Sequence, residues 1–300
     1  MSSSEVRVAE SEIPSVLVYD VGGSHVSAAV CRAGDYQLGQ VVSAPHPQEE
    51  TSDAFVALLH ALGVRANPNA QTVLGAGIAM PGPFDYAAGI SRMRHKLPYL
   101  FGVDLRAALS ARFHWRPEQI RFLNDAAAYL LGEVGAGAAR GFSRAVAITL
   151  GTGIGCAFAV EGRVVTQGRG VPPGGEIWNL PYEGKTVEDY LSTRALQQSF
   201  REQTDKESEV SAIAAAAAAG DAVACEVFAA FGRTLGRALR HLLAEFEPQV
   251  VVLGGGIARS SSLFLPAAMR ELDGLHMNLR ITALDSRAPL AGAGLAWFSS

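Results

Sequence analysis

Two short glycine-rich turns, each directly after an apolar run of β-strand character, lie in separate halves of this 300-residue chain. The first turn covers residues 20–24 (DVGGS) after the run SVLVY, and the second covers residues 151–155 (GTGIG) after the run AVAITL. Because glycine has no Cβ, consecutive backbone N–H groups in such turns can converge on an anion. The pair therefore predicts two phosphate-binding turns in two halves of related design, with the carboxylate of Asp125 between them in the sequence.

Length and composition set the broad class of the protein. One hydrophobic core stops growing at about 250–300 residues, so a chain of 300 residues is expected to form two lobes with a cleft between them. The chain is 49% hydrophobic and 18% charged, which is typical of a compact protein. Its net charge of -4 gives no electrostatic reason to expect a nucleic-acid partner.

The N-terminal segment MSSSEVRVAESEIPS lacks the apolar stretch of a signal peptide, and no later segment offers about 18 uninterrupted apolar residues. We therefore expect no membrane insertion and a cytoplasmic location. The cysteines Cys31, Cys156 and Cys225 are odd in number and far apart. Their apolar surroundings predict buried thiols rather than disulfides or metal ligands.

The hydrophobic pattern predicts the same order of elements in both halves. The first half is expected to contain strands at 15–19, 26–32 and 37–43, a helix at 52–63, a strand at 73–79, a helix at 104–114 and a strand at 120–123. The second half is expected to contain strands at 145–150, 156–161 and 163–166 and a closing strand at 249–253. A helix at 221–246, ended by Pro248, carries an apolar stripe that must be buried against the sheet or against a partner subunit.

Two carboxylates are candidates for chemistry. Asp20 ends a strand at the first glycine turn, where it could hold a hydrated Mg²⁺ against phosphates bound by Gly22, Gly23 and Ser24. The alternative interpretation of this segment is an ordinary hairpin turn. Asp125 follows a strand and begins the helical segment DAAAYLLGE, where Asn124 or Asp125 could cap the helix. Asp125 is also a candidate general base, and the two roles are compatible.

Two further segments have both a functional and a structural interpretation. Gly254, Gly255 and Gly256 follow the strand residues QVVV, and their bare backbone could accept an adenine ring or serve only as a flexible connection. Glu176 follows Gly174-Gly175 and could accept hydrogen bonds from a polyol or be an ordinary exposed loop residue.

Taken in order and spacing, the segments DVGGS, PGPFD, LNDAAAYLLGE, LGTGIG, GGEI, VEDYLS, AAAAGD and VVLGGGIA resemble the ROK family of bacterial sugar kinases and sugar-responsive repressors. The resemblance runs from about residue 15 to residue 298. It implies an α/β, two-lobed actin-like ATPase (ribonuclease H-like) fold with duplicated lobes and an interlobe cleft. We expect an N-terminal lobe at 1–118 that is completed by a C-terminal helix at 289–300, and a C-terminal lobe at 119–288.

The resemblance also implies roles for individual residues. ATP and Mg²⁺ are the expected cofactors, with Asp20 holding the metal through water and Asp125 as catalytic base. The residues that resemble the family's phosphate and adenosine motifs are Asp20, Gly22, Gly23, Ser24, Gly151, Thr152, Gly153, Gly254, Gly255 and Gly256. Asn124, Glu176 and Glu188 resemble its sugar-hydroxyl ligands, and Gly82 lies in the loop beside the sugar. Family members are commonly dimers or tetramers, so a homodimer is expected.

The chain departs from the family pattern at two places. Where the family has glutamate, any residue, glycine and histidine before a cysteine-rich zinc loop, this chain has Glu176-Ile177-Trp178-Asn179 and NLPYEGKT. Without thiolate or imidazole ligands there, we predict no structural zinc, with Asn179 available to a hydroxyl and Trp178 packed where the zinc loop braces the site. His95 and Lys96 stand where many members have a proline–asparagine pair that contacts the sugar, so the resemblance does not identify the substrate.

These observations together predict an ATP-dependent hexose kinase that phosphorylates glucose or a related sugar at the 6-hydroxyl. Two alternatives remain open. One is a sugar-sensing regulator, which is disfavoured because about 15 residues before the first strand are too few for a helix-turn-helix domain. The other is a sugar-binding protein that has lost catalysis, which the altered zinc loop and the His95-Lys96 substitution suggest.

Overall fold

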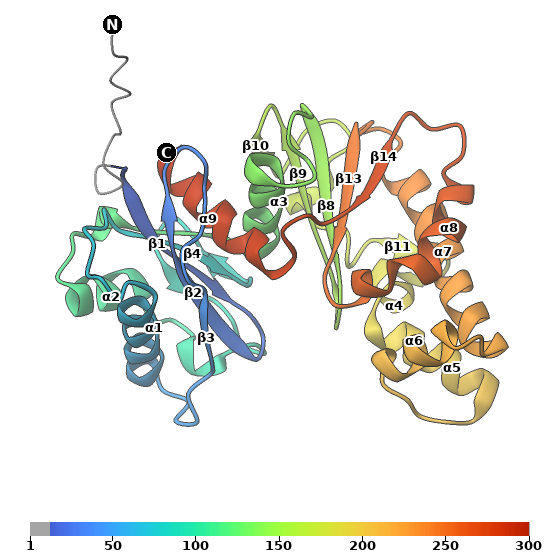
Figure 1. Cartoon of the computed structure of the whole chain (residues 1–300), viewed down its shortest axis with the longest axis horizontal. Helices are drawn as coiled ribbons and strands as arrows, with labels where there is room; N and C mark the ends of the chain where they lie inside the picture. Colours follow the sequence, from blue (N-terminus) through green and yellow to red (C-terminus); the bar gives the residue numbers. More distant parts are fainter. Residues whose placement is uncertain (1–12, 300) are drawn as a thin grey trace, which may run out of the picture. The chain divides into compact units, whose positions relative to one another are not determined.

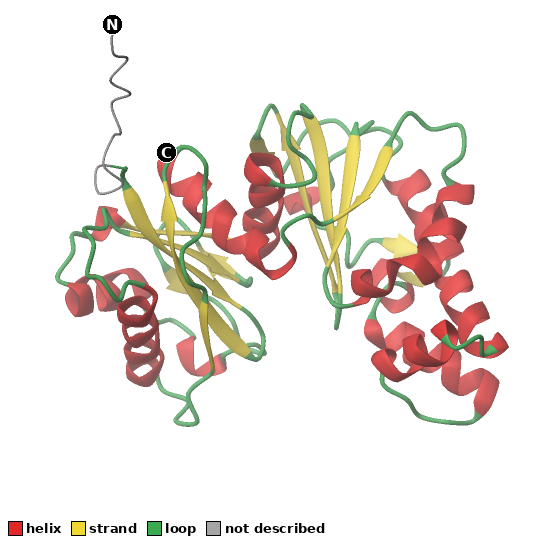
Figure 2. Cartoon of the chain, viewed as in Figure 1, coloured by secondary structure: helices red, strands yellow, loops and turns green. Residues whose placement is uncertain are grey.

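The computed structural model describes residues 13–299, and the chain divides into two compact units. Within the described residues, the first unit contains the chain up to Ala136 and again from Arg287 onward, and the second contains Gly137–Ser286. Both units combine a mixed β-sheet with helices (Figures 1 and 2). The division falls after residue 136, and the boundary expected from the sequence lies between residues 118 and 119.

A five-stranded sheet forms the centre of the first unit. It consists of β1 (Ser15–Val21), β2 (His25–Arg32), β3 (Val42–Pro45), β4 (Ala76–Met80) and β7 (Ile120–Asn124), in the order β3-β2-β1-β4-β7. The first three strands form an antiparallel meander, and β4 and β7 run parallel to β1. A strand that is buried on both faces needs apolar residues at every position, and β4, with the sequence AGIAM, is buried at all five.

Helices cover both faces of this sheet (Figure 2). On one face, α1 (Ser52–Ala66) and α2 (Leu105–Phe113) pack against the odd-numbered residues of β1, among them Leu17 and Tyr19. On the other face, α9 (Ala288–Phe298) packs against the even-numbered residues, among them Val16 and Val18. The C-terminal helix therefore belongs to the first unit.

Small residues bring α9 close to α3 (Asp125–Ala136). A Cβ added at Gly292 of α9 would overlap the carbonyl oxygen of Ala128, and one added at Gly132 of α3 would overlap the carbonyl oxygen of Ala288. The two helix backbones are therefore in direct contact, and this contact fixes the helix that begins at Asp125.

The second unit repeats the scheme of the first. Its sheet consists of β8 (Arg144–Leu150), β9 (Ile154–Val160), β10 (Arg163–Val165), β13 (Val250–Gly254) and β14 (Asn278–Ile281), in the order β10-β9-β8-β13-β14. Again three antiparallel strands are followed by two parallel ones. This confirms the duplicated design predicted from the sequence, although the edge strand β14 was not predicted.

The helices of the second unit pack mainly around one long helix. They are α4 (Val187–Tyr190), α5 (Thr193–Thr204), α6 (Val210–Ala218), α7 (Ala222–Leu242) and α8 (Ser261–Glu271). The predicted apolar stripe of α7 is buried inside this unit, with Phe228, Phe231 and Leu235 in the core. The predicted end was wrong, because α7 stops at Leu242 and Phe246 lies in the turn beyond it.

Short elements complete the described chain. Two small hairpins are formed by β5 (Phe84–Asp85) with β6 (Ile90–Ser91) and by β11 (Pro181–Tyr182) with β12 (Lys185–Thr186). Single 3₁₀ turns lie at Pro98–Leu100, Pro117–Gln119, Pro173–Gly175, Ile257–Ser260 and Asp285–Arg287.

Two further expectations need correction. The strand expected at 37–43 is found at 42–45, because residues 37–41 make only an isolated bridge at Leu38 and no continuous ladder. Cys31 and Cys156 are buried as predicted, but Cys225 is exposed. Its position on α7 lies off the apolar stripe that contains Ala224 and Phe228, which explains the exposure.

Within residues 13–299, no single helix is long and apolar enough to cross a membrane. Taken together, α6 and α7 are long and apolar enough, but the two helices are bent by 112° relative to each other.

Candidate functional site

Asp20 and Asp125 lie at the same edge of the first unit's sheet. Asp20 is the penultimate residue of β1, and Asp125 follows β7 as the first residue of α3. Both strands run parallel to β4, which lies between them, so the three strands end at one edge. In open α/β sheets, ligands bind beyond the carboxyl ends of the strands. The two predicted carboxylates are thus brought to the edge where such a fold binds its ligands.

The electrostatics of this edge favour a cation. Burial raises the pKa of Asp20 to about 7, and the nearby charge of Asp125 acts in the same direction. Carboxylate oxygens are ligands that Mg²⁺ accepts, and Mg²⁺ usually keeps several waters and binds through one or two carboxylates. Among residues 13–299, no group of three or more His, Cys, Asp or Glu side chains could hold a metal ion. Asp20 and Asp125 supply the one or two carboxylates through which Mg²⁺ usually binds, so this acid pair is compatible with a hydrated divalent cation.

The first glycine turn is a tight hairpin that His46 holds in place. The backbone N–H of Gly22 donates to the carbonyl of His25 at 3.0 Å. His46 donates from Nε2 to the carbonyl of Gly22 at 2.8 Å, because a carbonyl can only accept. Gly23 and Ser24 are exposed. Of the predicted phosphate-binding amides, that of Gly22 is therefore already used within the turn. Sequence reasoning missed His46, which lies 24 residues from its partner.

Asn124 caps the helix that begins at Asp125. Its Oδ1 accepts the backbone N–H of Ala127 at 3.1 Å, and its Nδ2 donates to the hydroxyl of Tyr86 at 3.2 Å. The Tyr86 hydroxyl in turn donates to the last carbonyl of β4 at 3.2 Å. Asp125 accepts the N–H of Ala126 at 2.9 Å through Oδ1. The cap predicted for this segment is thus formed by Asn124, and Tyr86, which the sequence analysis did not name, fixes its orientation.

The loop predicted to lie beside the sugar begins at the same edge. Gly82 and Pro83 follow β4, and the backbone N–H of Arg92 donates to the carbonyl of Pro83 at 3.1 Å. The segment that contains His95 and Lys96 is thereby tied to this edge, and both side chains are exposed. Neither residue takes part in an ion pair among residues 13–299.

In the second unit, Glu188 lies against the second glycine turn. This turn, residues 151–153, joins β8 to β9, and its Gly151 carbonyl accepts the N–H of Thr193 at 2.7 Å. Oε2 of Glu188 accepts the N–H of Ile154 at 3.1 Å. A Cβ added at Gly153 would overlap that carboxylate. Glu188, which the family resemblance assigns to a sugar hydroxyl, therefore also supports the turn.

Glu176, Trp178 and Asn179 form an exposed segment of the same unit. The indole Nε1 of Trp178 donates to Oε2 of Glu176 at 2.8 Å. Trp178 is 44% exposed, so the expectation that it packs in place of a zinc loop was wrong. The intervening residue Ile177 is buried and anchors the segment in the core, which directs its two neighbours outward.

Gly254, Gly255 and Gly256 lie at the edge where β8 and β13 end, because these two strands are parallel. Gly255 has a φ of +84°, and a Cβ there would overlap the carbonyl of Leu150. A Cβ at Gly256 would meet nothing within 4 Å. Glycine is thus required at position 255, and the backbone of Gly256 faces open space.

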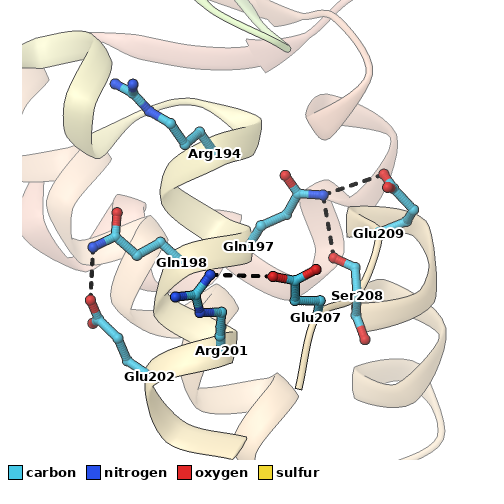
Figure 3. Close-up of a pocket in the computed structure, with 8 residues that line it drawn as sticks. All are labelled: Arg194, Gln197, Gln198, Arg201, Glu202, Glu207, Ser208 and Glu209. Carbon is cyan, nitrogen blue, oxygen red and sulfur yellow. Dashed lines mark hydrogen bonds and ion pairs between the residues drawn. The ribbon is translucent and has the colours of Figure 1, made fainter. Parts of the chain in front are cut away.

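One hollow in the described part of the chain is lined by none of the predicted residues (Figure 3). It has a volume of about 670 Å³ and is lined by α5 and the segment before α6. Figure 3 shows that its charged and amide groups pair with one another, for example Arg201 with Glu207 and Gln198 with Glu202. A second hollow, of about 340 Å³, lies around Arg144 and Phe246. Because its polar groups are largely paired, the larger hollow is an ordinary surface groove.

The fold and the duplicated glycine turns define a two-unit α/β protein of the actin-like ATPase class. The sequence matches the ROK family over residues 16–293, so the chain belongs to this family.

Similar proteins agree with this assignment. A glucokinase from Thermotoga maritima is 30% identical over 221 residues, which cover 66% of this chain and 68% of the relative. An N-acetyl-D-glucosamine kinase from Pectobacterium atrosepticum is 25% identical, covering 82% of this chain and 85% of the relative. The structure resembles a ROK hexokinase from Thermus thermophilus with a TM-score of 0.79 and 28% identity, covering 95% of this chain and 98% of that one. A ROK glucokinase from Streptomyces griseus, solved with glucose and AMPPNP, shares the fold with a TM-score of 0.77 and 22% identity, covering 95% of this chain and all of that one.

Proposed function

We propose that this protein is a sugar kinase that transfers the γ-phosphoryl group of ATP to a hydroxyl of a hexose such as glucose. The observation that carries the proposal is the pairing of Asp20 and Asp125 at one edge of the sheet, beside the first glycine turn. Family membership and the relatives named glucokinase, hexokinase and N-acetyl-D-glucosamine kinase support a sugar as the acceptor.

In this proposal Asp125 is the general base. The sugar hydroxyl donates its proton to the Asp125 carboxylate while its oxygen forms a bond to the γ-phosphorus, and the bond from that phosphorus to the bridging oxygen of ADP breaks. The first residue of α3 suits this role, because the contacts of Asn124 with Ala127 and Tyr86 fix the start of the helix. Phosphoryl transfer requires little covalent chemistry from the protein, so positioning of the reactants and neutralisation of charge supply most of the catalysis.

The other predicted residues supply binding groups. The amides of Gly23 and Ser24 in the first unit and of Thr152 and Gly153 in the second would donate to phosphate oxygens, whereas the amide of Gly151 donates to the carbonyl of Gly153 at 3.0 Å. Gly254–Gly256 would accept the adenine. Asp20 would hold the cation through water, and a bound Mg²⁺ would neutralise charge that develops on the phosphates. Relief of the repulsion between Asp20 and Asp125 favours this binding, since that repulsion contributes to the raised pKa of Asp20.

The test is a matrix of sugars against phosphate donors, with formation of the sugar phosphate measured for every donor and the product identified by NMR. Glucose, mannose, N-acetylglucosamine and N-acetylmannosamine would each be offered with ATP and with polyphosphate. We expect ATP-dependent phosphorylation of at least one hexose. Sugar binding without turnover for every donor would instead support a sugar-binding protein that has lost catalysis.

A further inference from the structure

The exposed indole of Trp178 is one feature that the proposed mechanism does not explain. The ring is 44% exposed, although a side chain of this size and apolarity is usually largely buried. It stands between Glu176 and Asn179, two residues predicted to contact the sugar. Ligand sites combine aromatic side chains with a small number of placed polar groups, and this segment holds both.

One hydrogen bond holds the ring, and two further features hold the backbone that carries it. Its Nε1 donates to the Glu176 carboxylate at 2.8 Å, and a hydrogen bond to a charged acceptor is stronger than one between neutral groups. Its backbone carbonyl accepts the N–H of Glu188 at 3.1 Å, and the preceding residue, Ile177, is buried. Because Glu188 also contacts Ile154 of the second glycine turn, the backbone of Trp178 is tied to that turn through a single residue.

This arrangement matches the two surfaces of a pyranose. A sugar ring presents hydroxyl groups around its rim and C–H groups on its faces, so it can donate hydrogen bonds to a carboxylate while one face lies on an aromatic ring. Glu176 offers the carboxylate, and Trp178 offers a flat apolar surface directly beside it. The ring needs little further ordering on binding, because its indole N–H is already anchored.

We propose that Trp178 is a stacking platform for the pyranose ring of the acceptor and that it contributes to the selection of the sugar. The inference rests on the proposed function, because it assumes that the ligand of this segment is a sugar. It predicts preference for acceptors whose C–H face is apolar and continuous. It also predicts that the fluorescence of this indole changes when the sugar binds in the absence of a nucleotide.

Intrinsic fluorescence of the full chain tests the direct contact. The chain has three tryptophans, and Trp115 and Trp297 are both less exposed and lie in the first unit. Titration with the sugar that the donor matrix identifies, or with glucose if none is turned over, should change the emission of the wild type. The change should be absent in Trp178→Phe, in which only the other two indoles remain. An equal change in Trp178→Phe, or a change with AMPPNP but not with sugar, would overturn the assignment.

Steady-state kinetics tests the energetic role. Trp178→Ala should raise the KM for the sugar about tenfold, the order expected for the loss of one aromatic contact, while kcat and the KM for ATP stay within about twofold. Trp178→Phe should recover most of the loss, because a benzene ring can still stack. Met269→Ala, which removes another exposed apolar side chain of the same unit, is the matched control and should leave all constants unchanged.

The two proposals can fail separately. Turnover of a sugar by a Trp178→Ala protein with an unchanged KM for that sugar would refute the stacking role of Trp178 but not the proposed kinase activity. A sugar-dependent change in the fluorescence of Trp178, in a protein that turns over no sugar, would refute the proposed kinase activity but not the stacking role of Trp178. Circular dichroism of each variant checks that it is folded.

Discussion

Replacing Asp20 with asparagine should change how stability depends on pH. The pKa of Asp20 is raised from its usual 3.8 to about 7, chiefly by burial and further by the charge of Asp125. Between these two values the folded protein keeps a proton that the unfolded chain has released. Stability therefore falls as the pH rises through this interval, because ionisation in the folded state is costly.

The size of this effect on the free energy of unfolding follows from the difference between the pKa of Asp20 in the folded and in the unfolded protein. About three pKa units at about 1.4 kcal/mol each give at most about 4 kcal/mol of unfolding free energy, lost between about pH 4 and pH 8. Asp20→Asn has no carboxyl to ionise, so its stability relative to the wild type should increase over this range. Asp125→Asn removes only the smaller of the two causes, so it should reduce the pH dependence without abolishing it.

Urea unfolding at several pH values, without divalent cations, measures this effect. In a Trp178→Phe background the remaining tryptophans, Trp115 and Trp297, both report on the first unit. The advantage of Asp20→Asn over the background protein should be small at pH 4.5 and largest at pH 8. An advantage that is constant across the range would refute the view that Asp20 is held in an environment that opposes its ionisation.

Two other substitutions test the packing around the acid pair. Gly292→Ala should destabilise the first unit by about 1–3 kcal/mol, because its Cβ would overlap the Ala128 carbonyl, and urea unfolding in the same background would detect the change. Unchanged stability would mean that α3 and α9 are not in close contact. Tyr86→Phe removes the hydroxyl that holds Asn124, so we expect a loss of about 1–2 kcal/mol and a higher KM for the sugar at an unchanged KM for ATP. Equal effects on both KM values would show that Tyr86 acts only through general stability.

Much of the fold could be predicted from the sequence, because local patterns determine it. The strands before each glycine turn are continuous apolar runs, and the same order of elements in both halves indicated two units of one design. Elements without a strong local pattern were missed. The edge strand β14, with the sequence NLRI, is partly exposed and offers too short an apolar run to be recognised.

The candidate site could be predicted as a set of residues but not as a set of contacts. Glycine turns and the residues at strand ends are visible in the sequence. The contacts of His46 with Gly22 and of Tyr86 with Asn124 join residues 24 and 38 positions apart, and only the pairing of the strands brings them together. The use of the Gly22 amide within its own turn likewise depends on backbone geometry that the residue type does not specify.

The measurement that tests the central claim most directly is the single-turnover rate of sugar phosphorylation by Asp125→Asn. Loss of a general base should lower this rate by about 10²- to 10⁴-fold, while the protein remains folded and still binds the sugar. Asp104→Asn is the matched control, because asparagine can replace the aspartate that caps α2 and this residue has no proposed role in catalysis. Its rate should equal that of the wild type. A rate for Asp125→Asn within a few-fold of the wild type would contradict the assignment of Asp125 as the base.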